Sequence, residues 1–262
     1  MTLQPSRTRI KTRPASRIRV VKTMSDLAEN RVVEEDVLEA AELPPVDGTA
    51  GGHINLARKR AFDLVLSSII LIVLSPILLV IALAIWMLDG RPIVFHHVRA
   101  GLDGKPFNFL KFRSMRTAES DSPHQEYVKR WIQGGEPFAH AADGSPLFKI
   151  QSHPRVTRLG YFLRRFSLDE LPQIINVLRG EMSLVGPRPA ITYEVDIYLP
   201  WHRRRLTAPP GVTGLWQVSG RNRLSFDEMV RLDLEYIDNW SLAGDLAILL
   251  RTPFAIVQGD GK

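Results

Sequence analysis

The acidic pair Asp169-Glu170, in the segment SLDELPQ (167–173), combines two carboxylates suited to phosphoryl chemistry. One carboxylate could attack a phosphorus atom as a nucleophile while its neighbour holds a divalent cation. The alternative is structural, because Ser167 followed by Glu170 has the spacing of a helix capping box. Pro172 weakens that alternative, since a helix that begins before it loses a backbone hydrogen bond. A helix that begins at Pro172 would leave both carboxylates just before its positive end, where anions also bind.

Six arginines lie between residues 155 and 188, around this pair. Guanidinium groups bind phosphate in a bidentate manner, which ammonium groups cannot do. The preference for arginine is weak evidence by itself, because arginine makes up 26 of the 34 basic residues of the chain. The six are Arg155, Arg158, Arg164, Arg165, Arg179 and Arg188.

Arg188 and Arg221 each lie in a segment rich in glycine or proline. The sequence Gly-Pro-Arg-Pro (186–189) fixes the backbone on both sides of Arg188. Arg188 is therefore either a rigid arm to an anion or an exposed side chain in a plain turn. Arg221 follows Gly220 in one of two glycine loops that enclose residues 215–218, for which we predict a short strand. Those loops either cradle a diphosphate or are ordinary turns.

Lys111 and Arg113 belong to an extended segment. Residues 106–115 read PFNFLKFRSM, and the three phenylalanines predict a strand. Further along, Ser225 precedes a capping-box pattern that predicts a helix, and Ser241 predicts the start of a last helix that stops near Pro253.

The segment from Leu64 to Leu88 contains no charged residue and predicts a membrane helix. Its 25 residues would extend about 37 Å as a straight helix, which is enough to cross a hydrocarbon core of roughly 30 Å. Ser75-Pro76 lies near its midpoint, where the proline removes a backbone hydrogen bond and predicts a kink. The segment is either an ordinary kinked transmembrane helix or a re-entrant hairpin.

Basic residues on both flanks of this segment favour the hairpin. The positive-inside rule places such flanks in the cytoplasm, and each half of the segment reaches only to mid-bilayer. We therefore predict a re-entrant helix-break-helix over residues 56–90. The flanking bases are Arg58, Lys59, Arg60, Arg91, Arg99, Lys105, Lys111, Arg113 and Arg116.

Composition limits the remaining possibilities. The 262 residues have 45% hydrophobic side chains, a net charge of +6 and no cysteine, which excludes a disulfide scaffold and thiolate chemistry. Residues 1–55 hold a basic block and then an acidic block with few large apolar residues, and we predict a mostly disordered tail. The basic end of that tail either attracts anionic lipid or is simply solvated. The sequence has no Walker A motif and no GxGxxG, and its histidines lack zinc-ligand spacing.

Several longer blocks, taken together and in order, resemble the bacterial sugar transferases, which are monotopic polyprenyl-phosphate hexose-1-phosphate transferases. The resemblance runs from about Arg58 to Gln258. It departs from the family at His96-His97, which replace Gln-Glu, and at Ser114, which replaces Thr, so no role is assigned to these positions. The matching blocks are the basic patch with Ser75-Pro76, KFRSM (111–115), SLDELPQ (167–173), LVGPRP (184–189) and PGVTGLWQVSGRN (210–222).

The resemblance implies an α+β protein in which a re-entrant membrane helix precedes a cytoplasmic catalytic domain, residues 91–262, of helices with a small sheet. It implies that Asp169 attacks the β-phosphate of a UDP-sugar, which gives an aspartyl phosphosugar and UMP. Undecaprenyl phosphate then accepts the sugar phosphate. Glu170 matches the family's Mg²⁺ ligand. The residues expected to bind phosphate or substrate are Lys111, Arg113, Arg164, Arg188 and Arg221.

The resemblance also gives expectations about the donor and the location. Residues 216–221, WQVSGR, look like those of members that transfer glucose or galactose phosphate, so the expected donor is UDP-glucose or UDP-galactose and the product starts an exopolysaccharide repeat unit. The protein is then expected at the bacterial inner membrane, with its catalytic domain on the cytoplasmic leaflet. A homodimer is compatible with this assignment, and nucleic acid is not an expected partner. The competing hypothesis is a membrane-anchored protein that binds anions or nucleic acid without turnover.

Overall fold

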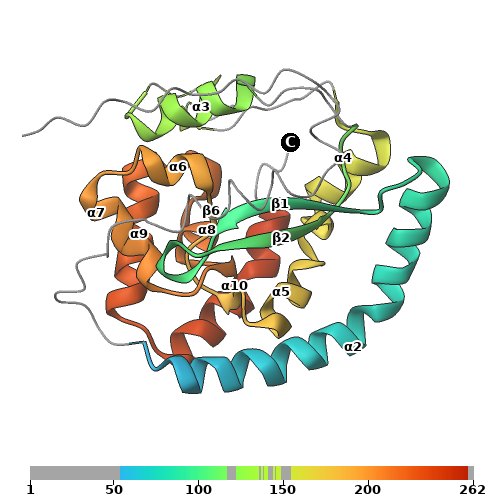
Figure 1. The fold of residues 1–262 in the computed structure, drawn as a ribbon, viewed down its shortest axis with the longest axis horizontal. Coiled ribbons are helices and arrows are strands. Elements are labelled where there is room, and N and C mark those ends of the chain that lie inside the picture. Colours follow the sequence, from blue (N-terminus) through green and yellow to red (C-terminus); the bar gives the residue numbers. More distant parts are fainter. Residues whose placement is uncertain are drawn as a thin grey trace, which may run out of the picture. The chain divides into compact units, whose positions relative to one another are not determined.

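The structure is a computed structural model that describes residues 54–116, 122–135, 137, 139–140, 144, 146–148 and 155–258. The predicted tail, residues 1–55, lies outside the described residues except for its last two positions. The described part contains helices and three small sheets. Figure 1 shows helices arranged around the two longest strands. The mixed α+β architecture predicted from the sequence is therefore confirmed.

The first described helix, α2 (Leu56–Leu88), is the only one in the described part that is long and apolar enough to cross a membrane. Asn55 caps it, because the Asn55 side chain accepts a hydrogen bond from the Arg58 backbone N–H at 3.0 Å. The helix continues through Pro76, and Figure 1 shows it bending midway along its length. Pro76 cannot donate to the carbonyl of Ile72, and the Ser75 hydroxyl donates to that oxygen instead, at 2.8 Å. The predicted kink is confirmed, but as a bend in a continuous helix without a break.

The three-stranded sheet has the order β2-β1-β6. Strand β1 (Val94–Ala100) pairs antiparallel with β2 (Pro106–Phe112), the strand predicted over 106–115, through a turn that holds the short 3-10 helix η3 (Leu102–Gly104). The other edge of β1 pairs with β6 (Ala190–Ile191). Two further pairs are β5 (Ser183–Val185) with β7 (Gly211–Thr213), which run parallel, and β3 (Ala139–His140) with β4 (Pro146–Leu147), which run antiparallel.

The helices after β2 are mostly short, and their starts follow the capping rules. The Ser225 hydroxyl and the Glu228 carboxylate form the predicted capping box at the start of α9. The helices of this part are α3 (Ser122–Ile132), α4 (Arg158–Arg165), η4 (Leu168–Glu170), α5 (Gln173–Arg179), α6 (Thr192–Asp196), α7 (Pro200–Arg203), η5 (Arg204–Thr207), α8 (Leu215–Ser219), η6 (Arg221–Arg223), α9 (Phe226–Asp238) and α10 (Leu242–Gln258).

Two local predictions are wrong. Residues 215–218 form the helix α8 rather than a strand, and this helix buries Trp216 and Gln217. The apolar run is too short for its periodicity to distinguish a buried helix from a strand. Its secondary structure therefore depends on how its side chains pack in the fold. The helix α10 begins after Ser241 as predicted, but it continues through Pro253 to Gln258.

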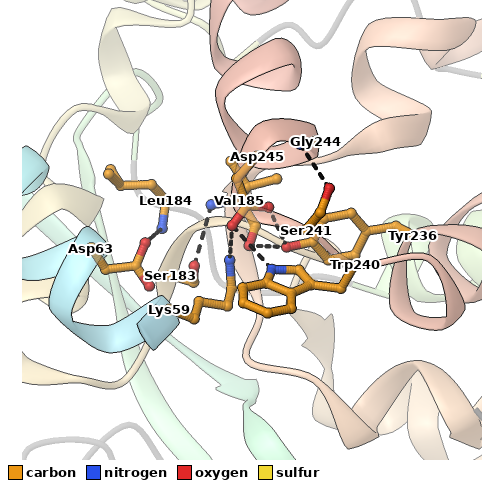
Figure 2. A network of polar contacts seen from close by, with 10 residues as sticks. All are labelled: Lys59, Asp63, Ser183, Leu184, Val185, Tyr236, Trp240, Ser241, Gly244 and Asp245. Atoms are coloured by element: carbon orange, nitrogen blue, oxygen red, sulfur yellow. Dashed lines mark hydrogen bonds and ion pairs between the residues drawn. The ribbon is translucent and has the colours of Figure 1, made fainter. Parts of the chain in front are cut away.

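Both ends of α2 are bound to the same globular part of the chain. Near the first end, Lys59 forms a 2.8 Å ion pair with Asp245 of α10, and Asp63 accepts the backbone N–H of Leu184 at 3.0 Å (Figure 2). At the other end, the Thr157 hydroxyl donates to the Asp89 carboxylate at 2.9 Å. Lys59, one of the flanking bases that the positive-inside rule places in the cytoplasm, is thus engaged in an ion pair inside the protein.

The middle of α2 makes no such contacts. Its buried residues are Lys59, Asp63, Ser67, Ile81 and Ile85, so that residues 68–80 include none. Ile81 and Ile85 pack with Phe112 of β2 and Leu163 of α4. These apolar contacts attach the second half of α2 to the globular part. The exposed middle is apolar, with side chains such as Ile72 and Leu79 more than 70% exposed.

Candidate active site

The segment that carries the acidic pair folds as a tight turn between two helices. Ser167 follows α4 with a backbone φ of 54°, in the left-handed region that non-glycine residues seldom occupy. The Ser167 side chain makes no capping hydrogen bond, so the capping-box interpretation is wrong. The 3-10 turn η4 then holds both carboxylates, and Pro172 precedes α5 as its N-cap. Left-handed backbone at a non-glycine residue costs about 1–3 kcal/mol and is concentrated at functional sites.

Glu170 is held by two basic side chains. Its Oε1 accepts from Lys111 Nζ at 2.9 Å and from Arg188 Nη2 at 3.0 Å. These two charges lower the pKa of Glu170 well below its ordinary value although burial opposes them. Glu170 is therefore ionised at every physiological pH.

Asp169 differs from its neighbour in its surroundings. It is 7% exposed, and among the described residues none donates a hydrogen bond to its side chain. Burial raises the pKa of Asp169 above its ordinary value, and the nearby charges of Lys111, Arg164 and Arg188 oppose that rise. The result is a carboxylate with unused lone pairs beside several cations, which is what a nucleophile toward an anionic phosphate requires.

Strand β2 places Lys111 beside the pair. Its Nζ lies 5.2 Å from the centre of the Phe109 ring on the same strand, and burial lowers the pKa of Lys111 while Glu170 opposes the change. Asn176 of α5 fixes this strand, because its Oδ1 accepts the backbone N–H of Leu110 at 3.1 Å. The strand that carries Lys111 is thus bonded directly to α5, the helix that follows the acidic pair.

The loop 186–189 positions Arg188, since each of its four residues has a backbone hydrogen bond. Gly186 N–H donates to Thr213 at 2.9 Å and Pro187 accepts from Gly211 N–H at 2.8 Å. Gly186 is required there, because a Cβ would lie 2.3 Å from the Pro209 oxygen. The carbonyls of residues 188 and 189 accept from Arg205 Nη2 at 3.2 Å and Arg99 Nη1 at 3.0 Å. The rigid-arm interpretation of Arg188 is therefore favoured over a plain turn.

The other predicted phosphate ligands are placed differently. Arg164, in the last turn of α4, is close enough to Asp169 to influence its pKa. Arg221 has a left-handed φ of 50°, donates to the Ala255 carbonyl at 2.8 Å, and its charge interacts with Glu170. Arg113 is not brought to the pair, because its guanidinium donates to the carbonyls of residues 89, 90 and 91 after α2. A phosphate-binding role for Arg113 stays a prediction.

Two arginines that support the site, Arg205, which is buried, and Arg99, which is partly buried, were not assigned a role by sequence reasoning. Arg205 forms a 2.6 Å ion pair with Asp233 and donates to the Tyr198 hydroxyl at 2.9 Å. Arg99 stacks over Phe109, and burial lowers its pKa to about 10. In the sequence, both residues are ordinary charges of a basic chain. Their roles depend on tertiary contacts, which no local pattern predicts.

The acidic pair can contribute to a divalent-cation site only together with a ligand. No group of three or more His, Cys, Asp or Glu side chains in the described residues could hold a metal alone. Mg²⁺ is often bound by one or two carboxylates together with substrate phosphates, and Glu170 can supply such a carboxylate. The residues thus fit a Mg²⁺ ion that takes most of its ligands from a diphosphate.

Comparison with known proteins gives a consistent match. The sequence model of the family described as bacterial sugar transferase matches residues 54–259. The undecaprenyl-phosphate galactose phosphotransferase of Salmonella typhimurium is 43% identical over 203 residues, which cover 78% of this chain and 41% of that protein. The exopolysaccharide production protein ExoY of Sinorhizobium fredii is 41% identical, with coverage of 78% of this chain and 87% of that protein.

A third relative is the UDP-glucose:undecaprenyl-phosphate glucose-1-phosphate transferase of Escherichia coli, 38% identical over 80% of this chain and 42% of that protein. The chain therefore spans about two fifths of the length of several relatives and most of the length of ExoY. The family match includes α2, the acidic pair, the loop of Arg188 and α10. On this evidence, the chain belongs to the bacterial sugar transferase family.

Proposed function

We propose that this protein transfers hexose-1-phosphate from a UDP-hexose to undecaprenyl phosphate, and so starts the assembly of an exopolysaccharide repeat unit. The observation that carries the proposal is the pairing of two unlike carboxylates in one turn. Glu170 is held ionised by Lys111 and Arg188, whereas Asp169 is buried and receives no hydrogen bond from a described residue. The names of the Salmonella and Escherichia relatives support the acceptor and the type of reaction.

The first half-reaction forms a covalent intermediate. An Asp169 carboxylate oxygen bonds to the β-phosphorus of the UDP-hexose, and the bond from that phosphorus to the bridging oxygen breaks. UMP leaves with the electron pair, and the hexose phosphate stays on Asp169. Arg188 and Lys111 oppose the negative charge that gathers on the phosphoryl oxygens, which is the main protein contribution to phosphoryl transfer.

The second half-reaction regenerates the enzyme. An oxygen of undecaprenyl phosphate bonds to the same phosphorus, and the acyl-phosphate bond to Asp169 breaks and restores the carboxylate. Glu170 would hold a Mg²⁺ ion together with the diphosphate of the donor. When bound, that ion would neutralise phosphate charge and make UMP a better leaving group.

In this proposal, α2 is re-entrant and holds the catalytic part at the membrane surface, where it can reach the lipid acceptor. A straight helix of 33 residues would be about 50 Å long and would separate its ends across a bilayer. Lys59 and Thr157 instead bind opposite ends of α2 to one globular part. This arrangement supports a hairpin that dips the exposed middle into one leaflet, with the catalytic part on the cytoplasmic side of the inner membrane.

The hexose is proposed as glucose or galactose. The proposal rests on residues 216–221 and on the donors in the names of the Escherichia and Salmonella relatives, which are glucose and galactose derivatives. A sugar that leaves a buried polar group of its binding site unpaired is rejected strongly, even when it resembles the correct hexose. Rates with different donors should therefore differ clearly.

The test measures UMP release by the purified protein with undecaprenyl phosphate and Mg²⁺. UDP-glucose, UDP-galactose and their two N-acetylhexosamine analogues are compared at equal concentration. We expect turnover with one of the first two donors and little with the acetylated ones. Faster UMP release from an acetylated donor would show that the proposed sugar is wrong, while the proposed type of reaction would stand. Salt-sensitive binding without UMP release from any donor would support the non-enzymatic, anion-binding alternative.

A further inference from the structure

Gln173, the first residue of α5, is a buried polar side chain without a partner. The residue is 1% exposed, and its Nε2 is buried without a hydrogen bond. No described residue bonds to the other end of the carboxamide either. A buried amide that forms no hydrogen bond costs free energy, so its retention needs an explanation.

Gln173 follows the proposed nucleophile by about one helical turn of the chain. Leu171 and Pro172 both have right-handed helical backbone angles, which connects η4 to α5 with little change in direction. Residues three and four positions apart share one side of such a turn. Gln173 is therefore on the side of Asp169 and Glu170, one turn further along the chain.

Asn176, three residues later on the same helix, shows what a structural carboxamide looks like here. Its Oδ1 accepts from the Leu110 N–H at 3.1 Å, and its Nδ2 donates to the Asn108 carbonyl at 2.7 Å and to Glu181 at 2.6 Å. Both ends of this side chain are used by the protein. Two buried carboxamides one turn apart thus differ completely in their bonding, and only the one next to Asp169 is free.

We propose that Gln173 Nε2 donates a hydrogen bond to a phosphoryl oxygen of the hexose phosphate that Asp169 carries, and is a further catalytic residue. The inference rests on the proposed function, since it assigns the ligand of the same site. The buried carboxamide nitrogen is a donor, and non-bridging phosphoryl oxygens are acceptors only, so the two match. The bond forms when the phosphoryl group arrives, which makes it a contribution to the reaction rather than to folding.

The experiment uses the full chain and separates stability from reaction. Gln173→Met keeps the shape and removes the unsatisfied polar group, so its thermal unfolding midpoint should equal or exceed that of the wild type. The rate of hexose-phosphate labelling of Asp169 at saturating UDP-hexose, without acceptor, should fall about 10- to 100-fold. The isosteric Gln173→Glu, which replaces the donor with an acceptor, should slow labelling at least as much. Asn176→Leu is the matched control and should lower the unfolding midpoint.

The outcomes distinguish this inference from the function on which it rests. Wild-type protein without label on Asp169 under excess donor overturns the proposed function and the inference with it. Labelled wild type with equally fast labelling of Gln173→Met overturns the inference alone. An unfolding midpoint for Gln173→Met as low as that of Asn176→Leu assigns a structural role to Gln173, and also overturns it. If Gln173→Met does not fold, the labelling rate of folded Gln173→Glu decides.

Discussion

At the scale of single residues, the two neighbouring carboxylates have different tasks because their surroundings differ. Two cations already engage Glu170, which suits a charge that stays in place and helps to hold a cation. Asp169 is buried beside positive charges without a hydrogen-bond donor, which leaves its oxygens available to a phosphorus atom. The resemblance already assigned different roles to the two residues, and their unlike surroundings in the structure support that proposed division.

Asp169→Asn should abolish transfer, because an amide cannot supply an anionic nucleophile. Mass spectrometry after brief exposure of wild-type protein to the donor alone should find one hexose phosphate on Asp169, and none on the variant. The variant should keep its folded state, since no described residue gives the Asp169 side chain a hydrogen bond that the substitution would remove. A label on another residue, or near-normal UMP release by Asp169→Asn, would contradict the assignment.

The pH dependence of the rate should report the ionisation of Asp169. Its pKa is raised above the ordinary 3.8 and that of Glu170 is lowered, so of these two carboxylates only Asp169 gains a proton as the pH falls through the range just above 3.8. The protonated form cannot attack, and kcat/KM for UMP release should fall below an apparent pKa that exceeds 3.8. Lys111 lowers the pKa of Asp169. In Lys111→Met, the remaining kcat/KM should therefore begin to fall at a higher pH than in the wild type as the solution is acidified. An acid limb at or below the ordinary pKa would count against Asp169 as the titrating nucleophile.

At the scale of elements, the contact between α2 and α10 depends on a buried polar network (Figure 2). Lys59 and Asp245 form an ion pair whose side chains are 2% and 0% exposed. Asp245 also accepts from the Tyr236 hydroxyl at 2.8 Å and from Trp240 Nε1 at 3.1 Å. The network therefore joins α2, α9 and α10 at one point.

Lys59→Met should lower the free energy of unfolding by about 3–5 kcal/mol, because it leaves the buried Asp245 carboxylate without its counter-charge. Denaturation in detergent measures the change. Arg58→Met is the matched control, since Arg58 is the exposed neighbour with the same charge, and it should shift the value by about 0.5 kcal/mol or less. Equal effects of the two substitutions would mean that the network contributes little to docking.

The elements also show what a sequence can and cannot predict. The strand at 106–112 and the helix after Ser225 follow from local patterns, namely phenylalanine-rich extension and a capping box. The helix α8 was missed, because its five residues are too few for a period and the burial of Trp216 decides. The pair Lys59–Asp245 could not be predicted at all, since its partners are 186 positions apart and each looked like an ordinary charge.

At the scale of the whole molecule, the described residues place a long apolar helix and the charged cluster around Asp169 and Glu170 in one globular part. The exposed apolar middle of α2 and the polar contacts at its two ends divide the helix into one exposed section and two docked sections. The proposed function would use this combination, because the tail of a lipid-linked acceptor stays in the bilayer while its phosphate has to reach Asp169.

The hairpin topology predicts that both flanks of α2 face the cytoplasm. The chain has no cysteine, so single cysteines at two exposed positions, Ala57 and Lys105, can be labelled without background. In intact cells, a membrane-impermeant maleimide should label neither position, and it should label both after the inner membrane is opened. Pro76→Leu restores the missing backbone donor and should favour a straighter helix, which would expose one flank to the periplasm. Labelling of either wild-type flank in intact cells would mean that α2 crosses the bilayer, and the ion pair of Lys59 with Asp245 could then not coexist with the docking of Asp89 by Thr157.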